Sequence, residues 1–80
     1  MNHAQLRDWL VTFVAETLEV APAEVDPDAT WDDLGIDSAS ILVLLASLEQ
    51  TADLAVRPVQ VLDHPTIERL ADHLTALGVA

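Results

Sequence analysis

Leu34-Gly35-Ile36-Asp37-Ser38 is the most informative segment of this sequence, and it leads directly into an apolar segment at residues 41–45. Glycine allows a sharp backbone turn, and Asp37 is a good N-cap for a helix that begins at Ser38. Turn and cap together place one serine hydroxyl at the start of a helix. Helix N-termini carry unpaired N–H groups and a partial positive charge, which suit a phosphate group or a phosphodiester.

The composition around this stretch predicts one small domain that spans residues 1–80. The chain has no cysteine, so it forms no disulfide and no thiolate metal site. Its start lacks the basic and apolar regions of a signal peptide, and its longest apolar run is too short to span a membrane. We therefore expect a discrete, monomeric, cytoplasmic protein.

The charge is strongly acidic, with a formal net value of −11 and three arginines as the only Lys or Arg residues. This balance argues against nucleic acid and against an anionic membrane as partners. It favours docking to basic patches on other proteins, although acidity that only keeps the domain soluble is the alternative. Six carboxylates crowd into one stretch without a compensating base: Glu24, Asp26, Asp28, Asp32, Asp33 and Asp37.

The first helix is predicted over residues 3–18, where Asn2 and Gln5 form a capping-box pattern. Its apolar face has helical spacing and consists of Leu6, Leu10, Phe13, Val14 and Leu18. A long acidic connection follows, punctuated by Pro22 and Pro27. Its expected apolar anchors are Val20, Val25, Trp31 and Leu34, of which Trp31 is expected to pack in the core and not to bind a ligand.

Three further helical segments are predicted after Gly35, over residues 38–51, in a short turn at 59–62, and from the N-cap Thr66 onward. The apolar face of the last helix consists of Ile67, Leu70, Ala71, Leu74 and Leu77, with Gly78 as the expected C-cap. Three principal helices and one short one make an all-α, four-helix bundle.

Catalysis by Ser38 itself is not supported by the pattern around it. The sequence lacks the second glycine of a nucleophile elbow, and spacing gives no reason to bring His3, His64 or His73 together for a triad. No HExxH pattern or clustered carboxylate–histidine pattern is present, so no metal site is predicted. We therefore expect no catalytic residues and no enzyme activity. A covalently carried cofactor would need only a presentable serine and a docking surface.

Two motifs at the expected separation resemble acyl carrier proteins of the polyketide-synthase type over nearly the whole chain. The first runs from Trp31 to Ser38, and the second is the Asp63-His64-Pro65-Thr66 segment with the helix that follows it. The resemblance implies a four-helix bundle with 4′-phosphopantetheine attached to Ser38. Leu34, Gly35 and Asp37 would then form the attachment site.

This resemblance also implies the partners. They are a phosphopantetheinyl transferase with coenzyme A, an acyltransferase, an acyl- or aminoacyl-loading enzyme and a ketosynthase. Ala39 replaces a larger aliphatic residue and Val43 replaces an acidic one, which favours a polyketide or related secondary-metabolite pathway over housekeeping lipid synthesis. The alternatives are a peptidyl or aminoacyl carrier and, from another class, an unmodified acidic helical adaptor. The least favoured alternative is a hydrolase that uses Ser38 as its nucleophile.

Two apolar stripes are predicted on the helix that begins at Ser38. Ile41, Leu44, Leu45 and Leu48 are expected to face the core. Ala39, Leu42, Val43 and Ala46 form a second stripe of the same spacing on the other side. A bundle of this size seldom buries a whole helix, so we expect the second stripe to be exposed as a docking surface, together with Asp32 and Asp33. The alternative is a central helix that buries both stripes.

Overall fold

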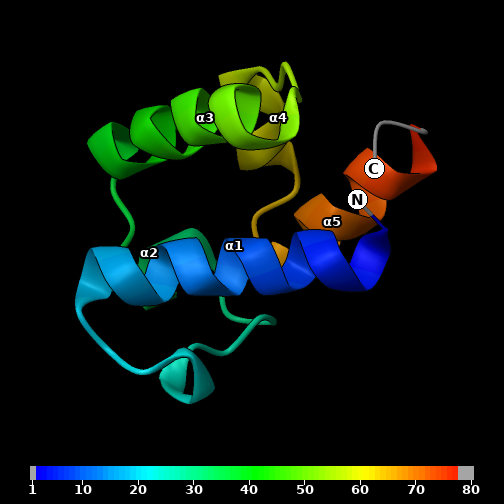
Figure 1. Ribbon diagram of the computed structural model, residues 1–80. Coiled ribbons are helices and arrows are strands. Elements are labelled where there is room, and N and C mark those ends of the chain that lie inside the picture. Colours follow the sequence, from blue (N-terminus) through cyan, green and yellow to red (C-terminus); the bar gives the residue numbers. More distant parts are fainter. Residues whose placement is uncertain (1, 78–80) are drawn as a thin grey trace.

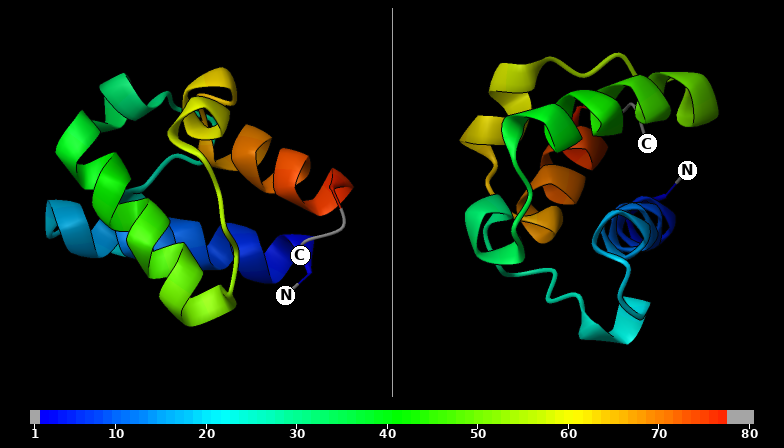
Figure 2. Two further views of the ribbon diagram at one scale, coloured as in Figure 1. Left: turned by 90° about the horizontal axis from the view of Figure 1, so that it is seen from above. Right: turned by 90° about the vertical axis from the view of Figure 1, so that its left-hand side faces the viewer.

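The computed structural model describes residues 2–77, and within them it confirms the all-α class. The elements are α1 (His3–Leu18), the 3₁₀ turn η1 (Pro22–Glu24), α2 (Trp31–Leu34), α3 (Ser38–Ala52), α4 (Pro58–Asp63) and α5 (Ile67–Ala76). In Figure 1, α3 lies above α1, and Figure 2 shows α4 and α5 along one side of the bundle. The four predicted helices are present, and η1 and α2 add local turns to the connection. The predicted C-cap Gly78 lies outside the described residues.

The first helix forms as its ends predict. Asn2 accepts a hydrogen bond from the Gln5 amide at 2.8 Å, and the Gln5 side chain accepts one from the Asn2 amide, which completes the capping box. At the other end, Glu19 adopts a left-handed conformation with φ of 58°. Because this turn ends the helix and leads the chain toward η1 (Figure 1), Val20 is 38% exposed, and its prediction as a core anchor was wrong.

The core lies between the three long helices and is closed by side chains from the connections. The first stripe of α3 is confirmed as its inner face, because Ile41, Leu44 and Leu48 are buried and Leu45 is partly buried. The buried apolar residues are Leu6, Leu10, Val14, Ala15, Val25, Trp31, Ile36, Ile41, Leu44, Leu48, Leu54, Val61, Ile67, Leu70, Ala71 and Leu74. Phe13, Leu18 and Leu34 are partly buried and pack against this cluster.

The last helix begins where Thr66 was predicted to cap it, with the Thr66 hydroxyl accepting from the Arg69 amide at 3.0 Å. The first four members of its apolar face are buried, and α5 packs along α1. Leu77 was wrongly predicted to belong to this face. It follows the end of the helix at Ala76 and is 56% exposed.

Backbone contacts tie the connection before α3 to the turn between α4 and α5. Thr30 and Thr66 form an isolated antiparallel bridge, and the Trp31 amide donates to the Pro65 carbonyl at 3.0 Å. The Trp31 indole Nε1 donates to the Val61 carbonyl of α4, also at 3.0 Å. Trp31 is only 4% exposed, which confirms its predicted packing role. These bonds hold α2 against α4 and the start of α5.

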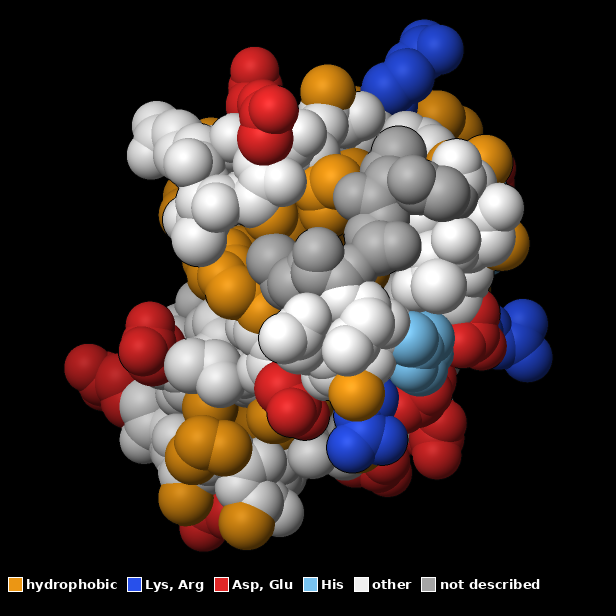
Figure 3. Space-filling view, turned by 45° about the vertical axis from the view of Figure 1, so that its right-hand side comes forward, with side chains coloured by type: hydrophobic (Ala, Val, Ile, Leu, Met, Phe, Trp, Pro, Cys, Tyr) orange, Lys and Arg blue, Asp and Glu red, His pale blue; other side chains and the backbone are white. Residues whose placement is uncertain are grey.

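Acidic side chains are spread over the face shown in Figure 3, with apolar side chains gathered between some of them. None of the helices in residues 2–77 combines the length and the apolar character that crossing a membrane requires.

Candidate functional site

The turn before α3 depends on Gly35, which ends α2 in the left-handed region with φ of 83°. Its amide donates to the Asp32 carbonyl at 3.1 Å, and the Ile36 amide donates to the Trp31 carbonyl at 2.8 Å. This is the Schellman arrangement, which ends a helix and reverses the chain. A Cβ at Gly35 would have room, 3.9 Å from the nearest Leu18 atom. Glycine is therefore favoured here for its backbone conformation and not for lack of space, because a left-handed conformation costs other residues roughly 1–2 kcal/mol.

Two residues later, Asp37 caps α3 and places Ser38 at its first helical position. The Ser40 amide donates to Asp37 Oδ1 at 2.9 Å, which confirms the predicted N-cap. Ser38 is exposed. The amides of Ser38 and Ala39 have no intrahelical acceptor at this end of the helix, and such amides favour a bound anion. The local geometry fits a phosphodiester on the Ser38 hydroxyl.

The hydrogen bonds of the cap also lower the pKa of the Asp37 carboxyl group. The Ser40 amide, with a smaller contribution from the Ser40 hydroxyl, lowers the pKa of Asp37 from its ordinary value of 3.8. A carboxylate with a lowered folded-state pKa stabilises the fold above its unfolded-state pKa and loses that contribution as pH falls through the folded-state pKa. The ionised cap therefore favours α3 at neutral pH.

We predict that Asp37→Asn is less stable than the wild-type protein near neutral pH, and that the difference disappears in acid. Asparagine can still accept from the Ser40 amide, so the substitution removes mainly the charge at the helix N-terminus. Urea unfolding of both proteins between about pH 7 and about pH 3 measures this difference. A gap that persists below the folded-state pKa would mean that the charge of Asp37 is not its cause.

Ser38 lines an open hollow of about 400 Å³ between α2, α3 and α4. Its apolar wall includes Trp31, Ile36 and Ile41, and Leu62 reaches it from α4. Its polar lining includes the carboxylate-bearing residues Asp32 and Asp37. The hollow is open, so a flexible group attached to Ser38 would have both solvent and an apolar wall beside it.

The second apolar stripe of α3 is exposed, as the sequence predicted. Leu42 and Val43 are 59% and 57% exposed, and Ala39 and Ala46 are also exposed. The two carboxylates predicted to accompany the stripe, Asp32 and Asp33, are exposed on α2. Exposure alone does not show that the stripe binds a partner, because exposed apolar side chains are common on protein surfaces.

Six carboxylates between residues 24 and 37 make no ion pair within the described part of the chain, whose ion pairs lie on α1 and α5. We predict that moderate sodium chloride raises the melting temperature, because salt screens repulsion between exposed charges over about 10 Å at 0.1 M. Thermal unfolding followed by circular dichroism at low and moderate salt checks this. A flat or falling melting temperature would contradict it.

Histidines pair in ways that sequence spacing did not predict. The rings of His64 and His73 stack with centroids 3.9 Å apart, and His3 Nε2 lies 2.6 Å from Asp72 Oδ1. The sequence has no clustered carboxylate–histidine pattern, but the fold brings His3 close to Glu68 and Asp72. Each pair joins elements that fold together from separate parts of the sequence, so no local pattern could indicate it. None of the three histidines lines the hollow at Ser38.

Comparison with known proteins places this geometry in a family. A family model described as "Phosphopantetheine attachment site" matches residues 8–74. The chain is 38% identical over 75 residues to one subunit of the phenolphthiocerol/phthiocerol polyketide synthase of Mycobacterium tuberculosis, with 94% of this chain covered. It is 35% identical over 75 residues to erythronolide synthase of Saccharopolyspora erythraea, with 92% of this chain covered. The chain spans only 4% and 2% of the lengths of these relatives.

Solved structures of small carriers share the whole fold. A free-standing peptidyl carrier protein from Acinetobacter baumannii superposes with a TM-score of 0.87 at 32% identity, covering 95% of both chains. An acyl carrier protein from Anabaena sp. PCC 7120 gives a TM-score of 0.88 at 30% identity, covering 96% of this chain and 88% of that one. The chain therefore belongs to the phosphopantetheine-attachment family of carrier proteins, whose covalent cofactor is 4′-phosphopantetheine.

Proposed function

We propose that this protein is an acyl carrier that holds thioester-linked intermediates on a 4′-phosphopantetheine arm at Ser38 during polyketide or related secondary-metabolite biosynthesis. The observation that supports it is the exposed Ser38 hydroxyl at the first position of α3, between the Gly35 turn and the Asp37 cap. The family model spans this position. The protein itself performs no catalysis in this proposal and works in the cytoplasm.

Each residue of the site has a distinct task in this function. Gly35 reverses the chain so that α3 begins at the surface, and Asp37 holds the first turn of α3 in place. When a phosphopantetheinyl transferase uses coenzyme A, Ser38 Oγ forms a bond to the phosphorus that carries the pantetheine and gives up its proton to the transferase or to water. The P–O bond of the pyrophosphate breaks, and adenosine 3′,5′-bisphosphate leaves. Once bound, the arm supplies the thiol on which acyl groups are carried.

Incubation with coenzyme A and a broad-specificity phosphopantetheinyl transferase tests this function. Intact-protein mass should increase by one phosphopantetheinyl group, and peptide mapping should locate it on Ser38. An unchanged mass with a transferase that modifies a known carrier in the same tube would contradict the proposal. That result would favour the unmodified acidic adaptor.

A peptidyl carrier is the second candidate, because the peptidyl carrier protein from Acinetobacter baumannii superposes over nearly the whole chain. Both kinds of carrier would accept the arm, so modification does not separate them. Loading of the modified protein with a panel of acyl and aminoacyl donors does. Preferential acylation by acyltransferases supports the acyl carrier, and preferential aminoacylation by adenylating enzymes supports the alternative.

The exposed stripe of α3, formed by Ala39, Leu42, Val43 and Ala46, is the surface that we propose for docking the partner enzymes. It begins beside Ser38, and an apolar patch next to a reactive group suits an enzyme that must reach that group. Asp32 and Asp33 on α2 add negative charge near the same end of α3, which favours partners with basic patches.

We predict that Leu42→Glu and Val43→Glu leave helicity and thermal stability nearly unchanged, because both side chains are exposed. Both variants should slow acyl transfer by a cognate partner, since a carboxylate would have to be desolvated in the interface. Gln50→Glu is the matched control, because it adds the same charge at an exposed position near the other end of α3.

Transfer rates and circular dichroism of the three variants check this prediction. If either stripe variant unfolds, the stripe belongs to the core and the docking proposal fails. If both fold and transfer acyl groups at the wild-type rate, partners dock elsewhere.

A further inference from the structure

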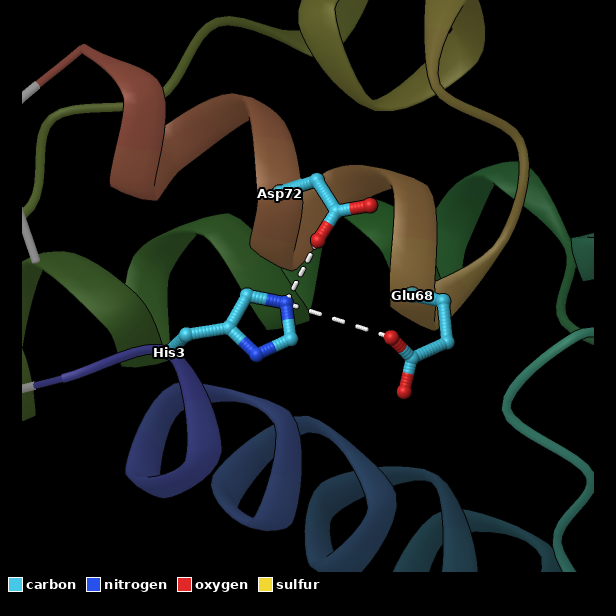
Figure 4. Close-up of side chains that lie close together, drawn as sticks. All are labelled: His3, Glu68 and Asp72. Carbon is cyan, nitrogen blue, oxygen red and sulfur yellow. Dashed lines mark hydrogen bonds and ion pairs between the residues drawn. The ribbon is translucent and has the colours of Figure 1, made fainter.

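A cluster of three potential metal ligands lies where the start of α1 meets α5, away from the residues that line the hollow at Ser38. His3 Nε2 is 2.6 Å from Asp72 Oδ1 and 3.9 Å from Glu68 Oε2. Figure 4 shows the imidazole reaching from α1 toward both carboxylates of α5. One ligand atom from each residue lies within 4.8 Å of the others.

The two helices hold these side chains together for separate reasons. Glu68 and Asp72 are four residues apart on α5, so their side chains lie on the same face of the helix. His3 is the first residue of α1, and α1 packs along α5. Arg7 Nη1 donates to Glu68 Oε1 at 3.0 Å, while Glu68 Oε2 is the oxygen nearest His3. A bond to the second oxygen of a ligating carboxylate is a common way to orient such a ligand.

We propose that His3, Glu68 and Asp72 bind one divalent transition-metal ion of the zinc class. Zinc bonds to histidine nitrogen and carboxylate oxygen are about 2.0–2.2 Å long, so ligand atoms around one ion lie roughly 3–4 Å apart. The His3–Glu68 separation is already in this range. The His3–Asp72 contact must widen, and the largely exposed Asp72 side chain has room to turn.

The chemistry of this donor set favours zinc over magnesium or calcium. Imidazole suits zinc and its neighbours, whereas magnesium and calcium take oxygen ligands. The two carboxylates offset the charge of the ion, and a fourth position remains for water. The ion would replace the direct contact between His3 Nε2 and Asp72 Oδ1 and would join α1 to α5, so binding should stabilise the folded chain.

Zinc titration of the unmodified 80-residue protein tests the proposal by calorimetry and by thermal unfolding. Protein without the arm is used because the thiol of the arm would also bind zinc. Zinc should raise the melting temperature, an excess of chelator should reverse the rise, and magnesium at the same concentration and in the same moderate sodium chloride should have a much smaller effect. In NMR spectra, the imidazole signals of His3 should shift with zinc.

Variants of the ligands make the test specific. His3→Gln should abolish the zinc-dependent rise, and Glu68→Gln and Asp72→Asn should each weaken binding by about tenfold or more. His64→Gln is the matched control, because the stacked His64–His73 pair is a second place within the described residues where zinc could bind. It should retain the full rise in melting temperature.

Two outcomes would overturn the proposal. In one, zinc neither binds nor stabilises the wild-type protein. In the other, His64→Gln abolishes binding and His3→Gln does not, which would assign the metal to the stacked pair. Neither outcome bears on modification of Ser38, so the carrier function is tested separately.

Discussion

Ser38→Ala should eliminate phosphopantetheinylation completely while leaving the fold intact. Ser38 is exposed at the first position of α3, and its side chain makes no contribution to the cap, which comes from Asp37. Alanine is also the best helix former, so the substitution does not weaken α3. We expect no mass increase after incubation with coenzyme A and a transferase, together with an unchanged circular dichroism spectrum.

Ser40→Ala is the matched control, because Ser40 lies two residues further along the same helix and is only partly exposed. Its backbone amide, which bonds to Asp37, survives the substitution. This variant should be modified to completion. Modification that persists in Ser38→Ala, or that maps to Ser40 or Ser47, would refute the assignment of the attachment site.

Leu44→Ala should destabilise the domain severely, whereas Leu42→Ala should not. Leu44 is 1% exposed and Leu42 is 59% exposed, so the same truncation on the same helix creates a cavity in one case only. Buried Leu→Ala substitutions cost about 2–5 kcal/mol. Small cores rarely supply more than about 3–5 kcal/mol of net stability, so a large fraction of Leu44→Ala should be unfolded at 25 °C.

Chemical unfolding followed by circular dichroism measures both variants. Leu42→Ala should remain within about 0.5 kcal/mol of wild type, as surface substitutions usually do. Equal losses in the two variants would show that α3 buries its whole circumference. That result would also remove the basis for a docking surface on its second stripe.

Sequence alone predicted the long helices and the local geometry of the site, because both depend on residues close together in the chain. The capping box at Asn2, the Gly35 turn and the Asp37 cap each involve residues only a few positions apart. The two stripes of α3 could be predicted for the same reason, because helical periodicity depends on residues only three or four positions apart.

What the sequence did not reveal depends on contacts between distant segments or on where a helix stops. Leu77 was wrongly predicted to belong to the apolar face of the last helix, because it continues the apolar pattern beyond the last helical residue, Ala76. Val20 was wrongly predicted to anchor the connection, because the left-handed turn at Glu19 leaves it exposed. The approach of His3 to Asp72 joins residues 69 positions apart. Hydrophobic periodicity and motif spacing relate residues that are close in the sequence, so they could not indicate this contact.

The bonds from Trp31 to Pro65 and Val61 have a consequence for when the site is complete during synthesis. Ser38 leaves the ribosome well before the α4–α5 turn that anchors the segment leading to it. A nascent chain that ends before Val61 has the serine and its cap, but it lacks both carbonyl groups to which Trp31 of α2 donates. On the proposed function, we therefore expect the arm to be attached late, after the C-terminal part of the chain has joined the bundle.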